Sequence, residues 1–409
     1  MKGGQSWAHE VLASAADPGP PDPVLLERAG PSQWASLFDA SSAHGMTGWL
    51  ARRLRPAPSV PQEWQLKLQG AALAIGQNHS RRLADARSAL ALLGANVLVL
   101  KGPALVERYY KDPTLRPYGD VDLYVLPGDF RRAVHELENE GYHLKDRNWD
   151  FIAGDMRGQL HFTAPSGGVI ELHWHVVNSG RQRKTLGMAS DELLRDATRS
   201  ELGGQACLAL QPADEVAHLC LHAALHGCNR LIWLLDIRML AETVQIDWDA
   251  MARRLHRWRF GPGGYLVLSL AAALTETAVP LDDLRPLRPR GFTRRAFARL
   301  VDTWDLGDVA RGAQVRELFF ATAADGFGAR MGLATDVIVP SVGQRNDRRE
   351  TGRRHALLRV TLGSVDRVRS KLRGEVSDFA EYRAQGEDPE TGRKRFFDAV
   401  DSGAQSTPG

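Results

Sequence analysis

The feature that most constrains the fold is a change of hydrophobic period near residue 94. Before Gly94, apolar residues recur at helical spacings. Residues 96–100 (NVLVL) instead form a short run of leucine and branched apolar residues, bounded by Gly94 and Gly102. A short apolar run between glycines is typical of a buried β-strand. The chain therefore changes at this point from helical structure to a sheet.

The same pattern predicts the order β-α-β-α-β-β from residue 96 to residue 177. Both predicted helices begin at a proline, which is favoured in the first helical turn. The SGG sequence at 166–168 links the last two strands and indicates a hairpin. The predicted strands are residues 96–100, 120–126, 158–165 and 168–177, and the predicted helices are residues 103–111 and 127–142.

Helical patterns flank this region on both sides. Upstream, the pattern predicts helices with a break near His44 and Gly45 and a last end at Gly94. Downstream of about residue 205 the chain is mostly helical, and one helix begins at Pro212. We therefore predict an α+β fold with a small mixed β-sheet between N-terminal and C-terminal helical regions. The expected divisions are a flexible arm (1–23), an N-terminal helical segment (24–94), the sheet core (95–205), a mainly helical region (206–375) and a disordered tail (376–409).

Composition excludes several classes of protein. A chain of 409 residues with 43% hydrophobic and 25% charged residues can form a sizeable core. A net charge of +3 is too small to indicate a nucleic-acid binder. No apolar run approaches the roughly 18 residues that cross a bilayer, so no membrane association is expected. Three cysteines without paired spacing, and an N-terminus without an apolar signal segment, predict a cytoplasmic location.

Two aspartates point to a metal site on the second predicted strand. Side chains alternate along a strand, so Asp120, Asp122 and Tyr124 share one face. Two carboxylates at this spacing repel each other unless a cation or solvent lies between them. Magnesium binds through one or two carboxylates together with substrate phosphates. Glu171, on a later strand that also carries His173 and His175, is the candidate third acid.

Lys101 and Gly102 add a phosphate-binding feature. They end the first strand immediately before a helix, and a helix N-terminus with free backbone N–H groups attracts phosphate. We predict that Lys101, Gly102 and Arg116 bind a nucleoside triphosphate. Asp120, Asp122 and Glu171 would bind two Mg²⁺ ions, with Mn²⁺ as a possible substitute. This arrangement predicts nucleotidyl transfer, in which two metal ions stabilise the attacking and leaving oxygens.

These motifs resemble the core of the DNA polymerase β-like nucleotidyltransferase superfamily. Its members carry a glycine turn after a strand, an hDhDh strand and a third acid on a later strand. More narrowly, the chain resembles a bacterial group labelled nucleotidyltransferase family protein, over about residues 35–260 and most densely at 97–142. The matching positions are Lys101 and Gly102, Arg116 with Asp120 and Asp122, Glu171 with His173, and His226, Trp233 and Asp236.

Two positions depart from the superfamily pattern. Pro103 follows Gly102 where many members have serine or glycine, and proline has no N–H to donate to a phosphate. Lys101 or Arg116 is therefore expected to contribute more of the phosphate binding. The third acid is glutamate rather than aspartate, so its side chain is longer by one methylene.

Several residues also permit other interpretations. His218, His222 and His226 recur every four residues on one helix face. With His173 and His175 they form a candidate zinc site, so a zinc-dependent hydrolase is the first alternative function. A catalytically idle nucleotide-binding module is the second, because Pro103 weakens the phosphate turn.

The predicted site residues also have ordinary structural interpretations. Asp120 and Asp122 can be a solvated surface pair, and Glu171 can be an ion-paired strand acid. Lys101 can simply end a strand, and Arg116 can pair locally with Asp112 or Asp120.

The acceptor side of the predicted reaction is less defined. We expect His173, His222, His226 and Asp236 to lie along an acceptor pocket, where Asp236 either orients His226 or pairs with Arg230 or Arg238. A small molecule, a peptide, a protein side chain and a tRNA end are all compatible acceptors. The base of the NTP and the oligomeric state cannot be predicted from this sequence. The basic tract 345–373 is expected to pack as one face of an amphipathic helix.

Overall fold

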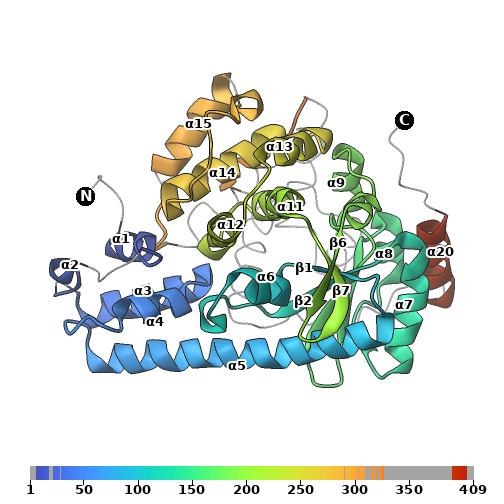
Figure 1. Cartoon of the computed structure of the whole chain (residues 1–409), viewed down its shortest axis with the longest axis horizontal. Helices are drawn as coiled ribbons and strands as arrows, with labels where there is room; N and C mark the ends of the chain where they lie inside the picture. Colours follow the sequence, from blue (N-terminus) through green and yellow to red (C-terminus); the bar gives the residue numbers. More distant parts are fainter. Residues whose placement is uncertain are drawn as a thin grey trace, which may run out of the picture.

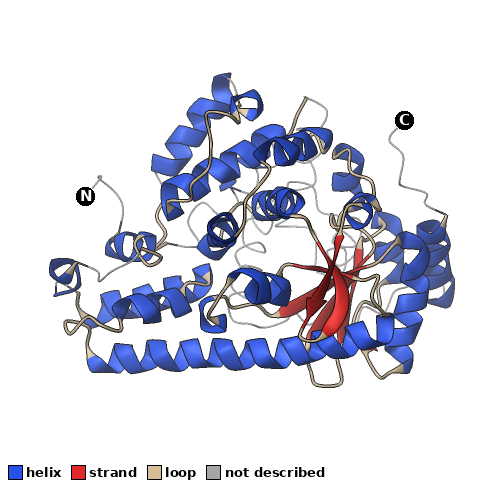
Figure 2. Cartoon of the chain, in the orientation of Figure 1, coloured by secondary structure: helices blue, strands red, loops and turns tan. Residues whose placement is uncertain are grey.

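The computed structural model describes residues 6–17, 22–27, 29–289, 291–302, 304–308, 315–316, 319–320, 323–326 and 389–402. It confirms the α+β fold class, with a mixed seven-stranded sheet surrounded by helices (Figures 1 and 2). None of the helices in these ranges has both the length and the apolar character of a membrane span.

The N-terminal region forms the helices expected from its hydrophobic period. A left-handed Gly45, with φ of 70°, separates α3 from α4 near the predicted break, and Gly94 ends α5. The long helix α5 runs along one side of the molecule, from the N-terminal helices to the sheet (Figure 1). The helices are α1 (Trp7–Ala13), α2 (Pro23–Glu27), α3 (Pro31–His44), α4 (Thr47–Leu54) and α5 (Gln62–Leu93).

The expectation of a flexible arm over residues 1–23 is wrong for its described part. Ser6 caps α1 by accepting a hydrogen bond from the backbone N–H of His9. Leu12 is fully buried, and the indole rings of Trp7 and Trp34 meet edge to face with centroids 5.3 Å apart. The apolar residues of this segment therefore pack against α3, a contact that the proline-rich sequence after it concealed.

The sheet has the strand order β3-β4-β5-β2-β1-β7-β6. The parallel pairs are β2 with β5 and β1 with β7, and all other neighbours are antiparallel. The four predicted strands correspond to β1, β2, β4 and β5, whereas β3, β6 and β7 were not predicted. The bounds are β1 (Leu98–Leu100), β2 (Asp120–Tyr124), β3 (His143–Leu144), β4 (Gln159–Thr163), β5 (Val169–His173), β6 (Thr198–Leu202) and β7 (Gln205–Ala209).

The two faces of the sheet have different environments. Val121, Leu123 and Ile170 belong to an apolar cluster that includes residues of α5 and of α7 (Pro127–Asn139). On the opposite face, Leu100 and Tyr124 belong to a larger cluster that includes residues of the N-terminal and the C-terminal helices. Asp122 and Glu171 lie on this second face, because Asp122 alternates with Val121 and Leu123 and is in register with Glu171. The acids therefore lie between the sheet and the helical region.

The remaining helices complete the described part of the chain. The predicted helices after β1 and β2 correspond to α6 (Gly102–Tyr109) and α7, and Pro212 begins α11 as expected. The other helices are α8 (Trp149–Asp155), α9 (Gly180–Thr185), α10 (Glu192–Arg195), α11 (Pro212–Leu225), α12 (Leu231–Thr243), α13 (Trp248–Arg257), α14 (Gly261–Thr275), α15 (Gly291–Asp302) and the short 3₁₀ turns Pro113–Leu115 and Arg285–Leu287.

The expectation of a disordered tail over residues 376–409 is also wrong for its described part. Residues Pro389–Asp401 form α20, which packs beside α7 and α8 (Figure 1). The ring of Phe396 lies 6.2 Å from that of Phe130 and 6.0 Å from that of Trp149. These aromatic contacts and the ion pair of Arg131 with Asp401 at 2.8 Å fix the helix. The basic tract 345–373 lies outside the described residues.

Candidate active site

The turn from β1 into α6 has an unusual backbone. Lys101 has φ of 41°, in the left-handed region that side chains other than glycine rarely adopt, and Gly102 has φ of 38°. A Cβ atom at Gly102 would lie 3.1 Å from the carbonyl oxygen of Asp120. The turn therefore brings the start of α6 against the start of β2, as the Lys-Gly sequence predicted, and it requires a glycine at this position.

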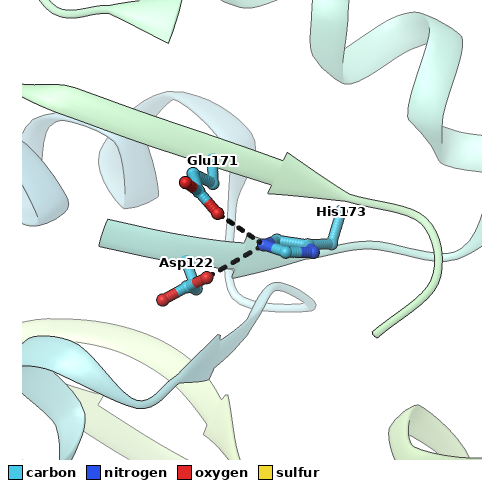
Figure 3. Close-up of side chains that lie close together, drawn as sticks. All are labelled: Asp122, Glu171 and His173. Atoms are coloured by element: carbon cyan, nitrogen blue, oxygen red, sulfur yellow. Dashed lines mark hydrogen bonds and ion pairs between the residues drawn. The ribbon is translucent and has the colours of Figure 1, made fainter. Parts of the chain in front are cut away.

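Asp122 and Glu171 converge with His173 on the helical side of the sheet. Parallel pairing of β2 with β5 puts Asp122 directly opposite Glu171, and His173 follows two residues later on the same face. One donor atom from each residue lies within 4.8 Å of the other two. Figure 3 shows one edge of the imidazole facing both carboxylates, and Nε2 lies 3.0 Å from Asp122 Oδ1 and 3.7 Å from Glu171 Oε2. The expected meeting of these two distant acids is thus present.

Asp120 lies at the start of the same strand face, outside this group of three. Its side chain is half-buried, and burial together with the charges of Glu171 and Asp122 raises its pKa to about 7. By contrast, burial alone would raise the pKa of Asp122, but Lys101 and His173 outweigh it and lower that pKa below its usual range. The three acids therefore form one electrostatic unit, in which Asp120 is the most easily protonated.

Lys101 pairs with one of these acids. Its Nζ atom lies 3.2 Å from Asp122 Oδ1, and both side chains are largely buried. Burial by itself lowers the pKa of Lys101, but Asp122, Asp120 and Glu171 outweigh it and raise the pKa. The ammonium group thus balances part of the negative charge, in the place where a cation or a phosphate is expected.

A second row of polar residues holds Glu171 from β4, and sequence analysis missed it. Gln159 Nε2 donates to Glu171 Oε2 at 2.8 Å, and His161 Nε2 lies 3.4 Å from Glu171 Oε1. His161 Nδ1 lies 2.8 Å from Asp146 Oδ2. Although burial lowers the pKa of His161, these two carboxylates outweigh it and raise the pKa to about 10. The alternation of Gln159 and His161 along a predicted strand was the available signal.

Arg116, a predicted nucleotide-binding residue, forms a buried ion pair with Asp236. Arg116 Nε and Nη2 donate to the two carboxylate oxygens of Asp236 at 2.7 and 2.8 Å. The hydroxyl of Tyr110 donates to the same carboxylate at 2.8 Å. Neither Asp112 nor Asp120 is the partner that local pairing suggested, and Asp236 pairs with Arg116 rather than with Arg230 or Arg238.

The histidine row consists of His218 and His222 on α11 and His226 at its C-cap, and it meets Trp233 of α12. The ring centroids of His222 and His226 lie 4.8 Å apart, and each ring lies within 5.6 Å of Trp233. Burial and the charge of Lys101 lower the pKa of His218 to about 3, and the same two causes lower the pKa of His222. The row therefore lies within electrostatic reach of Lys101.

The described residues do not support a zinc site built on this row. Within the described ranges, Asp122, Glu171 and His173 are the one group of at least three metal-ligating side chains with converging donor atoms. His175 lies apart from them: its Nδ1 accepts from the N–H of Val177 at 3.0 Å, and its Nε2 lies 3.3 Å from the carbonyl oxygen of Met188. Those contacts assign His175 to the packing after β5.

Arg230 is a further cation near the acids that sequence analysis gave no binding role. Its Nε donates to the carbonyl oxygen of Ala43 at 3.2 Å, and its guanidinium lies 5.9 Å from the ring centre of Trp233. Burial and the charge of Arg116 lower the pKa of Arg230, while Asp120 acts in the opposite direction. Arg230 thus lies within electrostatic reach of Asp120. Unlike Arg116, whose guanidinium forms a two-bond ion pair with Asp236, Arg230 makes its one described hydrogen bond to a backbone carbonyl.

Comparison with known proteins identifies one family. A family model described as an uncharacterised nucleotidyltransferase matches residues 30–276, which include the whole sheet, the acids, the Lys101 turn and the histidine row. No curated protein is detectably similar to the chain.

Proposed function

The chain belongs to this family of uncharacterised nucleotidyltransferases, and on that premise we propose that it transfers a nucleoside monophosphate from an NTP to an acceptor. The acceptor nucleophile forms a bond to the α-phosphorus, the bond from that phosphorus to the bridging oxygen breaks, and pyrophosphate leaves. The observation that carries the proposal is the register of Asp122 with Glu171, beside the turn formed by Lys101 and Gly102.

The donor set fits a divalent cation of the magnesium class. Asp120, Asp122 and Glu171 supply hard carboxylate oxygens, which magnesium prefers. Burial, together with the charges of Glu171 and Asp122, raises the pKa of Asp120 to about 7, as expected for a buried group of acids with too little positive charge nearby. In this proposal, Asp120, Asp122 and Glu171 would hold the ions, and the ions would neutralise the charge that develops on the reacting phosphate.

Cationic side chains of the protein bind the triphosphate in this proposal. The turn at Gly102 presents the start of α6, and a helix N-terminus favours a phosphate group. Pro103 offers no N–H, so the ammonium of Lys101 would carry more of the phosphate binding. Arg230 is a better candidate than Arg116 for a second contact with the triphosphate, because Arg116 already donates to both carboxylate oxygens of Asp236.

The acceptor lies, in this proposal, between the acid face of the sheet and the histidine row. His222, His226 and Trp233 bring their rings together there, and burial together with the charge of Lys101 lowers the pKa of His222 well below its ordinary value. A neutral imidazole both accepts and donates a hydrogen bond, so His222 can orient a hydroxyl group without adding charge. Glu171 is the candidate to receive the acceptor proton.

The test is transfer of label from NTPs labelled at the α-phosphate. Purified protein is incubated with Mg²⁺, a cell lysate and each of ATP, CTP, GTP and UTP in turn, and both labelled products and released pyrophosphate are measured. Asp122→Asn should abolish both signals. Asp129→Asn is the matched control, because Asp129 lies exposed on α7 and pairs with Arg132. Absence of both signals with every NTP, or undiminished signals in Asp122→Asn, would refute the proposal.

A further inference from the structure

His173 has the geometry of a metal ligand. Its Nε2 lies 3.0 Å from Asp122 Oδ1 and 3.7 Å from Glu171 Oε2, so a single point between the three side chains is within reach of all of them. The ring extends from β5 with one edge toward both carboxylates (Figure 3). Asp120, which the sequence pattern pairs with Asp122, is not a member of this converging group.

The ring is also buried without full hydrogen bonding. His173 is 4% exposed, and its Nδ1 atom has no hydrogen-bond partner among the described residues. A buried polar atom without a partner costs free energy, and such atoms concentrate at functional positions. His173 Nε2 and Lys101 Nζ both approach the same oxygen, Asp122 Oδ1, at 3.0 and 3.2 Å.

The other two donors are held in fixed positions. Gln159 donates to Glu171 Oε2 at 2.8 Å, and His161, which is itself bound to Asp146, approaches Glu171 Oε1. Such outer contacts orient carboxylates that bind metals. Asp122 is held by its place in the centre of the sheet and is 1% exposed. Three donors on two adjacent strands thus form a rigid set.

The chemistry of this set differs from that of three carboxylates. Magnesium prefers oxygen ligands in strict octahedral geometry, whereas imidazole nitrogen suits later divalent metals. Manganese takes carboxylate oxygens as magnesium does, and as a first-row transition metal it also binds imidazole, although more weakly than iron, copper or zinc does. A mixed site with two carboxylates and one imidazole therefore favours Mn²⁺ over Mg²⁺ while keeping a metal that performs phosphate chemistry.

We propose that His173 is a nitrogen ligand, with Asp122 and Glu171, of a Mn²⁺-preferring centre. The inference rests on the proposed function, because it names the metal class of that site. It assigns to the histidine of the Glu-x-His strand a direct role in metal selection rather than a place in the acceptor pocket.

The test is electron spin echo spectroscopy of the full chain with MnCl₂, with and without a non-hydrolysable ATP analogue. Wild-type protein should show nitrogen coupling to Mn²⁺ that changes when histidine is labelled with ¹⁵N. The coupling should vanish in His173→Gln and persist in His161→Gln, whose ring contacts Glu171 from outside the group. Loss of even an outer partner weakens metal binding about 10–100-fold, so His173→Gln should raise the Kd for Mn²⁺ at least about tenfold and leave that for Mg²⁺ nearly unchanged.

Three results would overturn the inference. Bound Mn²⁺ without nitrogen coupling in the wild-type chain would remove His173 from the ligand set, and label transfer with Mg²⁺ would show independently that the proposed function stands. Coupling that persists in His173→Gln would assign the nitrogen to another residue. No Mn²⁺ binding with or without the analogue would reject the centre, and absence of label transfer would then reject the proposed function as well. If His173→Gln does not fold, the wild-type experiment still tests the inference, because absence of histidine nitrogen coupling overturns it, and His173→Asn is then the variant that identifies the residue.

Discussion

The ion pair of Arg116 with Asp236 gives the sharpest prediction about the fold. Arg116→Met removes the guanidinium but keeps most of the side-chain volume. It leaves the Asp236 carboxylate, whose side chain is 0% exposed, with only the hydroxyl of Tyr110 as a hydrogen-bond donor among the contacts described above. Because a buried charge without its counterion is strongly unfavourable, the variant should be markedly less stable than the wild type.

The magnitude follows from the geometry. Breaking a buried pair by removing one partner costs about 3–5 kcal/mol. Two charge-assisted hydrogen bonds of 2.7 and 2.8 Å put this pair within that range. For a chain of this length, a loss of about 4 kcal/mol corresponds to a fall in Tm of roughly 5 °C. Replacing the whole network (Arg116→Met, Asp236→Leu and Tyr110→Phe together) should recover much of the loss, because no buried charge then remains.

Urea denaturation followed by circular dichroism measures these differences. The matched control is Arg132→Met, because Arg132 forms ion pairs with Asp129 and Glu136 while 54% of its side chain is exposed. Its loss should change the free energy of unfolding by less than about 1 kcal/mol. If Arg116→Met unfolds at the same urea concentration as the wild type but binds NTP more weakly, the structural reasoning is wrong and Arg116 acts on the nucleotide.

Three further predictions concern packing and pH. Gly48→Ala should destabilise the protein by about 1–3 kcal/mol in urea denaturation, because the new Cβ would lie 1.9 Å from the carbonyl oxygen of Thr114. Gly70→Ala, in open space on α5, should instead stabilise it by about 0.5–1 kcal/mol. Equal changes in the two variants would contradict this prediction. Phe396→Ala should release α20, with a cost of about 3–5 kcal/mol, and limited proteolysis should then cut residues 389–402 first; unchanged protection would contradict it. Burial lowers the pKa of His44 to about 4, so the stabilising contribution of neutral His44 is complete above pH 6.5 and is lost as the pH falls toward 4. At pH 5 the loss in the free energy of unfolding should be about 2 kcal/mol. If the free energy of unfolding of His44→Gln falls as much between pH 7 and pH 5 as that of the wild type, this prediction is wrong.

Much of the sheet was predictable because its signals are local. The alternation around Asp120 and Asp122 and the apolar run before Lys101 specify strands by themselves, and prolines mark the helices that follow. The hairpin of β6 and β7 was missed because the residues of β6 are mostly exposed and give no apolar pattern. The Gly203-Gly204 pair between these strands was the signal that could have found it.

The site was predictable in part for the same reason. A strand pattern indicates which residues share a face, so Glu171 and His173 could be proposed as neighbours. It does not indicate which distant residues pair, so the partnership of Arg116 with Asp236, 120 residues away, lay beyond local reasoning. The same holds for α20, because its apolar residues pack against α7 and α8, which are distant in the sequence.

The position of α20 has a consequence for the newly made chain. The aromatic surface of α7 and α8 is complete once residue 155 has emerged from the ribosome, but Phe396 and Phe397 follow more than 200 residues later. At about 5–20 residues per second, that surface stays uncovered for roughly 10–50 s. During this interval it is a binding surface for chaperones and a site of aggregation, so nascent chains halted before α20 should be captured by a holdase that releases the finished protein.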